Sequence, residues 1–326
     1  MPLIINEEQL MLKNSAKEFL KDRAPISALR QLRDERNELG LDRSLWREMA
    51  DMGWACMTIP EEFGGLDFGY VGLGQVLEEM GRTLTASPMI STVLLSATAI
   101  NFAGNDDQKN ELLPAIAEGK ILVSTAMDES NRHQPFRIKT TAVKNDNGYV
   151  INGKKAFVLD GHIADKLIVV ARTSGDTNNK SGISLFIVDA NDAAIQRERT
   201  VMMDSRNAAI IQFDNLQVPA SALLGEEGKG GFVLDIVLDV ARIGLSAEML
   251  GSMKEAFERT MAYLKERQQF GVTIGSFQAL QHRAAEMFTE IELCKSVVLK
   301  ALQAIDEKSK LLPGLASLAK AKIGST

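Results

Sequence analysis

The sequence predicts an α+β multidomain protein, with an N-terminal α-helical domain, a middle antiparallel β-barrel or sandwich domain and a C-terminal α-helical bundle. Apolar residues recur with helical periodicity over residues 1–120 and again over residues 229–326. Residues 121–228 instead contain short apolar runs flanked by turn residues, a pattern typical of β-strands. The length of 326 residues and the hydrophobic content of 45% are sufficient for two or three cores. We therefore expect domains at 1–120, 121–228 and 229–326.

The N-terminal domain begins with a helix whose start and buried face are both visible in the sequence. Asn6 precedes two acidic residues, as expected for an N-cap and a first helical turn. The apolar residues at helical spacing are Leu12, Ala16, Phe19 and Leu20. A second amphipathic helix is expected from about Asp42 to Gly53. Further helices are expected over residues 70–79, 91–102 and 106–118.

Between these helices, Ile59–Gly65 combines a proline with paired glycines and predicts a loop. The glycines of residues 64–74 lie close together, but they follow no predicted strand and no Gly-Lys-Ser/Thr sequence opens a helix there. We therefore do not expect a phosphate-binding loop in this domain.

Four strands are predicted in the middle domain, over residues 148–153, 167–170, 183–188 and 210–213. Several short strands without long helices between them favour an antiparallel barrel or sandwich over a βαβ sheet. The glycine-rich segment Gly225–Gly231 is interpreted as a linker.

The C-terminal domain is expected to contain a long helix that Gly271 terminates. The predicted buried face of this helix consists of Met253, Phe257, Met261 and Leu264. Arg267, Gln268 and Gln269 are expected at its C-terminal end, where a charged side chain can reach a ligand or a second subunit. A buried stripe further along the chain consists of Met287, Ile291, Cys294 and Val298.

The composition argues against several classes of protein. The formal net charge of −6 and the pI near 5.4 do not suit a general nucleic-acid-binding surface. No apolar run approaches the roughly 18 residues of a membrane span, and the N-terminus does not resemble a signal peptide. Cys56 and Cys294 form no metal-spaced cluster and are interpreted as buried free thiols. We therefore expect a cytoplasmic protein that binds neither nucleic acid nor membranes.

Several short motifs follow one another in a specific order. The C-terminal domain contains Tyr263-x3-Arg267-x2-Phe270-Gly271, then Phe277-Gln278 and Gln281-His282. The N-terminal domain contains Ile59-Pro60-Glu61-Glu62-x-Gly64-Gly65 and then Glu78-Glu79-x-Gly81-Arg82. Together these motifs closely resemble the acyl-CoA dehydrogenase family over essentially the whole chain.

The resemblance implies the acyl-CoA dehydrogenase fold, with FAD bound in a cleft between the β domain and the C-terminal helices. Family members remove two hydrogens from Cα and Cβ of an acyl-CoA, which gives the trans-2-enoyl-CoA. They usually pass the electrons to an electron-transferring flavoprotein. They are generally tetramers, so the resemblance implies a homo-oligomer, either a tetramer or a dimer, or a heteromer with a homologue.

One segment resembles the flavin-binding loop of the family. Ala126–His133 matches Ala-Met-Thr-Glu-Pro followed by Gly-Ser-Asp, and the match assigns Met127 and Asp128 to the cofactor. The threonine and the Gly-Ser-Asp are absent here, so backbone N–H groups are expected to make the contacts. His133 and His162 are interpreted as surface loop residues rather than catalysts.

A second segment, Asn152–Gly161, resembles the family sequence Asn-Gly-x-Lys-x-Trp-Ile-Thr-Asn-Gly. Phe157 takes the place of the tryptophan as an aromatic wall against the flavin ring. Val158 and Leu159 follow it, and the Leu159 amide is expected to reach the flavin. The Val-Leu-Asp-Gly ending resembles a bacterial branch of the family.

The resemblance assigns further contacts to the C-terminal domain. Asp239 and Arg242 match the Asp-x-x-Arg that contacts the acyl-CoA, although an ordinary intrahelical ion pair explains the same spacing. Arg267 matches the arginine that reaches the FAD diphosphate of a neighbouring subunit. The other matching cofactor contacts are Gln269, Phe270, Phe277 and Gln278.

No catalytic base can be assigned from the sequence. The usual glutamate of the family lies in a segment beyond Thr326, and the alternative position, just before Arg242, holds Ala241, which cannot accept a proton. Three hypotheses remain open. The chain is a dehydrogenase that continues beyond Thr326, a non-catalytic or half-site subunit of a heteromeric dehydrogenase, or a fold relative acting as a flavin monooxygenase or a binding protein. The acyl group is not determined by the sequence.

Overall fold

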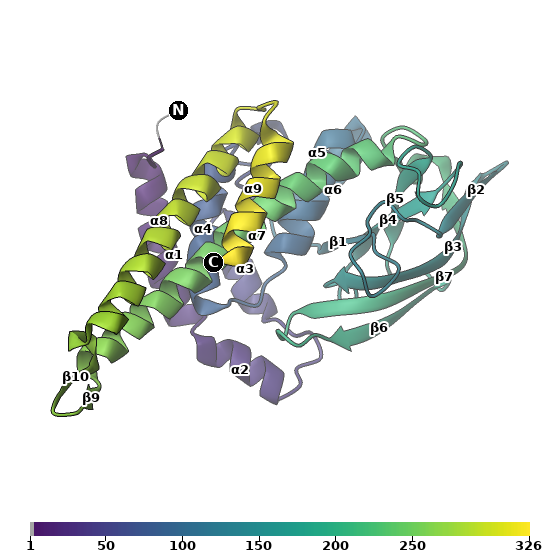
Figure 1. Ribbon diagram of the computed structural model, residues 1–326. Helices are drawn as coiled ribbons and strands as arrows, with labels where there is room; N and C mark the ends of the chain where they lie inside the picture. Colours follow the sequence, from purple (N-terminus) through teal and green to yellow (C-terminus); the bar gives the residue numbers. More distant parts are fainter. Residues whose placement is uncertain (1–2) are drawn as a thin grey trace. The chain divides into compact units, whose positions relative to one another are not determined.

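A computed structural model describes residues 3–326 (Figure 1). The chain forms two compact units, and each is built from segments far apart in the sequence. The first unit consists of the described part of Met1–Leu29 together with Phe68–Thr85 and Arg242–Thr326. The second unit consists of Arg30–Asp67 and Ala86–Ala241. Along the chain, N-terminal helices are followed by a β-sheet and then by C-terminal helices, so the predicted fold class is confirmed.

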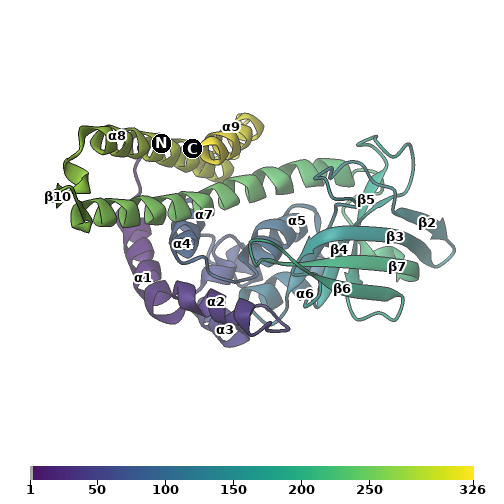
Figure 2. The ribbon, with the colours of Figure 1, turned by 60° about the horizontal axis from the view of Figure 1, so that its bottom comes forward.

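The first unit is helical. Its helices are α1 (Glu7–Arg23), α4 (Tyr70–Thr83), the C-terminal part of α7 (Gly230–Glu266), α8 (Gln278–Asp306) and α9 (Leu312–Ser325). Helix α1 packs on α4, α4 packs on α8, and α9 lies beside α8 (Figure 2). The predicted N-cap is confirmed, because Asn6 Oδ1 accepts the Gln9 N–H at 2.8 Å. The Gln9 side chain accepts the Asn6 N–H in return, at 2.9 Å.

Two glycines allow α4 and α7 to approach closely. A Cβ atom on Gly81 would lie 1.8 Å from the carbonyl oxygen of Glu248, and one on Gly251 would lie 1.7 Å from that of Glu78. A side chain at either position would therefore push the two helices apart.

The end of α7 differs from the prediction. The helix stops at Glu266, and the next residues form a hairpin of β9 (Gln268–Gln269) and β10 (Val272–Thr273) instead of a last helical turn. Phe270 and Gly271 both have positive φ, 55° and 80°, as a two-residue hairpin turn requires. The prediction that Gln268 and Gln269 end the helix was wrong, because Gly271 belongs to a hairpin turn and not to a helix C-cap.

The stripe predicted to be buried on α7 is only half-buried. It comprises Met253, Phe257, Met261 and Leu264. Phe257 contacts Phe288 of α8, with ring centroids 6.3 Å apart, and Phe288 is itself 54% exposed. A hairpin of two helices leaves one side of each helix uncovered, which explains why this stripe keeps contact with solvent in a single chain.

The second unit combines short helices with a sheet. It contains part of α2 (Ile26–Asp34), then α3 (Arg43–Asp51), a π-helical segment η3 (Met89–Ala97), α5 (Thr98–Ala103) and α6 (Asp106–Ala117). Short 3₁₀ turns lie at η1 (Trp54–Cys56) and η2 (Glu61–Phe63). Helix α2 was not predicted, and none of its side chains is buried. The single helix predicted over residues 91–102 is instead η3 followed by α5.

The sheet has eight strands. They are β1 (Val123–Ala126), β2 (Thr141–Asn145), β3 (Gly148–Leu159), β4 (Lys166–Arg172), β5 (Ile183–Asp189), β6 (Ile195–Val201), β7 (Asn207–Pro219) and β8 (Leu223–Leu224). Their order is β6-β7-β3-β2-β4-β5-β8, and β1 pairs with β4. The four predicted strands are present, and most neighbouring strands pair antiparallel as predicted. Two pairings differ, because β1 runs parallel to β4 and β2 meets β4 in parallel at one residue.

Alternate residues of β4 and β5 belong to different hydrophobic cores. Ile168 and Val170 pack into a core that also contains residues of α6 and the start of α7. Leu167 and Val169 pack into a second core made almost entirely of strand residues, which is typical of a sheet that curves around its own interior.

The glycine-rich segment interpreted as a linker is part of the second unit. Lys229 forms a β-bridge with Ile183, and Gly228 O accepts the Gly182 N–H at 3.0 Å. The Tyr149 hydroxyl donates to Glu227 at 2.8 Å. Because these contacts tie residues 227–229 to β3 and β5, the linker interpretation was wrong.

Candidate functional site

The cofactor residues predicted in the second unit lie together at one end of the sheet. Strand β1 leads directly into Met127 and Asp128, and β3 ends with Phe157–Leu159. The two segments are joined by a hydrogen bond, because the Ala156 N–H donates to Asp128 O at 2.8 Å. The structure thus brings together five residues that are about thirty positions apart in the sequence.

Phe157 is presented by a bulge in β3. The register between β3 and β7 shifts between Lys155 and Val158, which marks the bulge. Phe157 has a φ of 52°, a left-handed conformation that aromatic residues rarely adopt. Its side chain is 41% exposed, whereas Val158 is 1% exposed. The bulge therefore turns one aromatic ring towards solvent while the next residue anchors it in the core.

Asp128 has an acceptor role in its own loop. One of its carboxylate oxygens accepts the Gln134 N–H at 2.8 Å, and the other lies 2.8 Å from His133 Nδ1. The His133 side chain is 56% exposed and that of Asp128 is 15% exposed. His133 is therefore a surface loop residue, as predicted, and Asp128 orders the loop rather than pointing freely into solvent.

A buried lysine stabilises the same loop from the protein interior. This role was not predicted from the sequence. Lys155 is fully buried, and its Nζ donates to Met127 O at 3.0 Å and to Glu129 Oε1 at 2.8 Å. Glu129 also accepts the backbone N–H groups of Lys139 and Thr140, at 2.7 and 2.9 Å. The signal was present in the Asn-Gly-x-Lys motif, where a lysine occupies an inward position of a strand.

The ionisation of this pair follows from its burial. Removal from water lowers the pKa of Lys155 to about 8, although the Glu129 carboxylate opposes that change. Burial acts to raise the pKa of Glu129, but the Lys155 ammonium and the Thr140 N–H outweigh it and hold that pKa below its usual value. The carboxylate therefore remains charged at neutral pH and keeps its three bonds, to Lys155 Nζ and to the N–H groups of Lys139 and Thr140.

His162 does not match its predicted description as a surface residue. It is half-buried, and both ring nitrogens are buried without a hydrogen-bond partner in the described part of the chain. Burial, together with the positive charge of Arg199, lowers its pKa. The imidazole is therefore held neutral near physiological pH, because the surrounding unit covers the turn that follows β3.

The cofactor residues predicted in the C-terminal domain lie together in the first unit. They are on the β9–β10 hairpin and at the start of α8, and they comprise Arg267, Gln269, Phe270, Phe277 and Gln278. The Phe270 and Phe277 rings meet edge to face with centroids 6.2 Å apart, and they are 91% and 38% exposed. The guanidinium of Arg267 is exposed and makes no ion pair with a residue in the described range 3–326. Among the described residues, the segment that contains the hairpin thus presents an unpaired cation and exposed aromatic rings.

Asp239 and Arg242 both lie on α7, three residues apart, and so share a face of the helix. Asp239 is 7% exposed and Arg242 is half-buried. Ala241, at the alternative base position, packs its methyl group against the core that includes α6. The helix therefore offers a buried carboxylate and a guanidinium but places no proton acceptor at residue 241.

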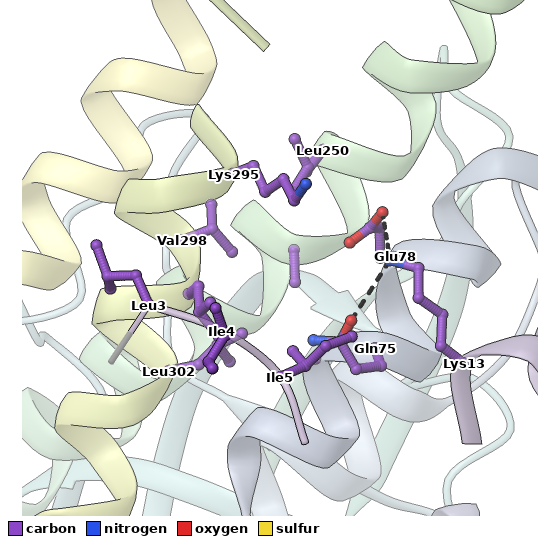
Figure 3. Close-up of a pocket in the computed structure, with 13 residues that line it drawn as sticks. Leu3, Ile4, Ile5, Lys13, Gln75, Glu78, Leu250, Lys295, Val298 and Leu302 are labelled. Atoms are coloured by element: carbon purple, nitrogen blue, oxygen red, sulfur yellow. Dashed lines mark hydrogen bonds and ion pairs between the residues drawn. The ribbon is translucent and has the colours of Figure 1, made fainter. Parts of the chain in front are cut away.

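The first unit also contains a cavity of about 340 Å³ between α1, α4, α7 and α8 (Figure 3). Leu250, Val298 and Leu302 contribute apolar walls, and the segment that contains Leu3 and Ile4 passes over them. The cavity is lined by residues outside the predicted cofactor and substrate sets.

Glu78 forms the polar end of this cavity. Its carboxylate lies 2.7 Å from Lys13 Nζ and 2.6 Å from Lys254 Nζ, and the residue is 5% exposed. Burial alone would raise the pKa of Glu78, but the two ammonium groups outweigh it and lower that pKa. Because the Glu78 carboxylate pairs with both ammonium groups, this cluster stabilises the packing of α1, α4 and α7.

Neither a metal-ligand cluster nor a membrane-spanning helix is found among residues 3–326. No group of three or more His, Cys, Asp or Glu side chains there is arranged to hold a metal ion. None of the helices formed by these residues combines the length and the apolar character needed to span a bilayer. Cys56 and Cys294 are both buried free thiols, as predicted.

Sequence models of three acyl-CoA dehydrogenase domains match the chain. The N-terminal domain matches residues 6–120, the middle domain residues 126–216 and the C-terminal domain residues 228–326. The mitochondrial 2-methylacyl-CoA dehydrogenase of Solanum tuberosum is 32% identical over 304 residues, a match that covers 91% of this chain and 73% of that protein.

Solved structures share the fold over nearly the whole chain. Butyryl-CoA dehydrogenase from Megasphaera elsdenii aligns with a TM-score of 0.89 at 27% identity, covering 100% of this chain and 86% of that chain. A variant of the Tcur3481-Tcur3483 steroid acyl-CoA dehydrogenase aligns with a TM-score of 0.85 at 33% identity, covering 97% and 82%. PigA, solved with FAD and proline, has the same fold, with a TM-score of 0.90 at 24% identity over 100% and 85%. The chain belongs to the acyl-CoA dehydrogenase family.

Proposed function

We propose that the protein is an FAD-dependent acyl-CoA dehydrogenase, an oxidoreductase that converts an acyl-CoA thioester to the trans-2-enoyl-CoA. The observation that carries the proposal is the exposed Phe157 ring, held on a rigid bulge beside the Met127–Asp128 loop in a member of this family. When bound, FAD supplies the acceptor for the hydride that leaves Cβ of the substrate.

The residues at the end of the sheet fit an isoalloxazine ring. Phe157 offers an aromatic face that is already oriented by its left-handed backbone, so little conformational freedom is lost when a ring packs against it. Lys155 and Glu129 hold the adjacent loop in place from the interior. On this proposal Phe157 packs against the flavin ring, Lys155 and Glu129 hold the loop beside it, and substrate chemistry is left to other groups.

Arg267 fits the FAD diphosphate of a neighbouring subunit. A guanidinium matches two phosphate oxygens at once, and Arg267 is exposed and unpaired among the described residues. Phe270 and Phe277 add exposed aromatic surface beside it. On this proposal each FAD contacts two copies of the chain, so the protein works as a dimer or tetramer.

For the substrate, we propose that Asp239 and Arg242 contact the acyl-CoA from α7, with the electrons passing on to an electron-transferring flavoprotein. Ala241 cannot take the α-proton, so the base lies elsewhere in the assembly. The alternative is a half-site subunit that depends on a homologue for its base. The following experiment distinguishes this alternative from an enzyme that is active by itself. The comparisons do not favour the flavin monooxygenase or binding-protein hypotheses.

The test is an anaerobic titration of the purified protein. The protein is first loaded with FAD, freed of excess cofactor, and then mixed with a panel of CoA thioesters while flavin absorbance is recorded. We expect stable yellow protein that bleaches with at least one thioester. FAD uptake without bleaching across the panel would favour the half-site subunit, and a protein that never retains FAD would contradict the proposed function.

A further inference from the structure

Asp160 follows the bulge that presents Phe157 and occupies an unusual environment. It is 8% exposed, and its φ of 53° is left-handed, like that of Phe157 three residues earlier. Aspartate tolerates this conformation better than most residues because its short side chain can bond locally. Val158 and Leu159 thus lie between two residues in the left-handed conformation, Phe157 and Asp160. Asp160 directly follows the last residue of β3.

The carboxyl of Asp160 is bound by a residue far away in the sequence. Ser91 Oγ donates to Asp160 Oδ2 at 2.5 Å, and Ser91 is 1% exposed in the π-helical segment η3. On the other side, the Asp160 N–H donates to Asn207 O at 3.2 Å, at the start of β7. The turn after the bulge is therefore held by both η3 and β7.

The segment η3 is in turn fixed to β1, which carries the other half of the candidate flavin site. Thr92 Oγ1 donates to Val123 O at 3.1 Å and accepts the Val123 N–H at 3.2 Å. Ser96 Oγ lies 2.9 Å from the same carbonyl oxygen. A continuous set of hydrogen bonds thus links the Phe157 bulge, through Asp160 and η3, to the strand that leads into Met127.

We propose that Asp160 is a positioning residue for the cofactor, whose bond to Ser91 sets the orientation of the Phe157 bulge relative to the Met127–Asp128 loop. The proposal rests on the proposed function, because it concerns how the flavin site is held. Asp160 acts through Phe157 and does not itself contact the cofactor.

The charge on Asp160 gives this role a pH dependence. Burial, against the opposing effects of Ser91, Asn207 and the positive charge of Arg206, raises the pKa of Asp160 to about 6. The ionised carboxylate accepts a charge-assisted bond from Ser91, which is stronger than the bond to a neutral carboxyl. His162, two residues further on, is held neutral by burial and by Arg199. The Ser91–Asp160 bond is therefore strongest above the pKa of Asp160, although burying the charge itself costs folding free energy.

The first test measures the bulge itself, without cofactor. Hydrogen exchange of the amides of residues 156–161 is compared in the apo forms of the native protein, Ser91→Ala and Ser91→Thr. Loss of one hydrogen bond to a charged acceptor is expected to raise exchange about tenfold in Ser91→Ala, and Ser91→Thr is expected to restore protection. Ser252→Ala serves as the matched control, since that serine donates to Gly81 O in the other unit and should leave these amides unchanged.

The second test measures cofactor affinity as a function of pH. The FAD dissociation constant of the native protein is expected to increase between pH 7.5 and pH 5, and Asp160→Asn is expected to remove most of that dependence and to bind FAD about tenfold more weakly at pH 7.5. A merely structural residue would change stability without removing the pH dependence of binding.

The outcomes separate the two proposals. If the native protein binds no FAD, the proposed function fails, while the exchange experiment on the apo protein still decides whether Ser91 and Asp160 hold the bulge. If FAD binds and Ser91→Ala changes neither exchange nor affinity, the positioning role is overturned. An equal pH dependence in Asp160→Asn and the native protein would overturn it as well.

Discussion

Replacement of Lys155 by methionine probes the interior support of the candidate flavin site. The methionine side chain has a similar length and fills the same space, but it donates no hydrogen bond. The substitution leaves Met127 O without its donor and Glu129 without its cation, because both contacts come from the same ammonium group. Lys154, the adjacent residue, is exposed and provides a matched control as Lys154→Met.

The expected cost can be worked from these contacts. Removing one member of a buried ion pair costs roughly 3–5 kcal/mol, because the remaining charge is left buried. Glu129 retains two backbone N–H donors and its side chain is 11% exposed, which reduces the free-energy cost of the substitution. We therefore expect Lys155→Met to lower the unfolding free energy by about 2–3 kcal/mol, which corresponds to a Tm decrease of about 3–5 °C for a chain of 326 residues.

The assay is thermal and urea denaturation of four proteins, the native form, Lys155→Met, Glu129→Gln and the double variant. Neutralising Glu129 removes the stranded charge, so the double variant should be more stable than Lys155→Met alone, with a coupling energy of about 2 kcal/mol. Lys154→Met should differ from the native protein by less than about 0.5 kcal/mol. Additive single effects, or a Lys155→Met as stable as the Lys154→Met control, would refute this description of the pair.

Three further predictions concern FAD retention and pH-dependent stability. Arg267→Ala should release FAD in gel filtration while the exposed control Arg47→Ala retains it, and equal retention would remove Arg267 from the cofactor site. Asp160→Asn should gain stability relative to the native protein by about 1 kcal/mol between pH 5 and pH 7.5, because the folded-state pKa is raised and the native carboxylate becomes destabilising as pH rises through it. Denaturation curves without this divergence would contradict the assignment. Glu78→Gln should cost about 1–3 kcal/mol at pH 7, because the folded-state pKa is lowered, and the cost should vanish as pH falls below the usual glutamate range. A cost that persists at low pH, or one matched by the exposed control Glu62→Gln, would show that charge is not the cause.

Where periodicity and capping residues were strong, the elements could be predicted from the sequence. Asn6 and Asp42 both cap the helices expected after them, because a side chain that accepts N–H groups has the same effect in any context. The helix α2 was missed although Ile26, Leu29 and Leu32 recur at helical spacing, because the segment is only nine residues long and none of its side chains is buried. The parallel pairing of β1 with β4 was missed because strand direction depends on partners far away in the chain.

The residues of the candidate site also differ in how far the sequence predicts them. Phe157 and Met127 could be predicted as cofactor contacts because they lie within motifs whose residue types can be matched position by position. The bond between Ser91 and Asp160 joins residues 69 positions apart and has no local pattern. Lys155 was visible as part of a motif, but only its complete burial reveals that it supports the loop from inside.

Mixed oligomers test the central claim most directly, that one FAD is bound by the bulge of one chain and by Arg267 of another. Arg267→Ala and Phe157→Asp chains, each unable to retain FAD alone, are unfolded together, refolded as a mixture and assayed for FAD per chain. In a mixed dimer one site has both native contributions, so random pairing should restore about a quarter of the native FAD content. A mixture of Arg267→Ala with the double variant should restore none. Absence of recovery in the first mixture, with mixed oligomers shown to form, would contradict a site shared between chains.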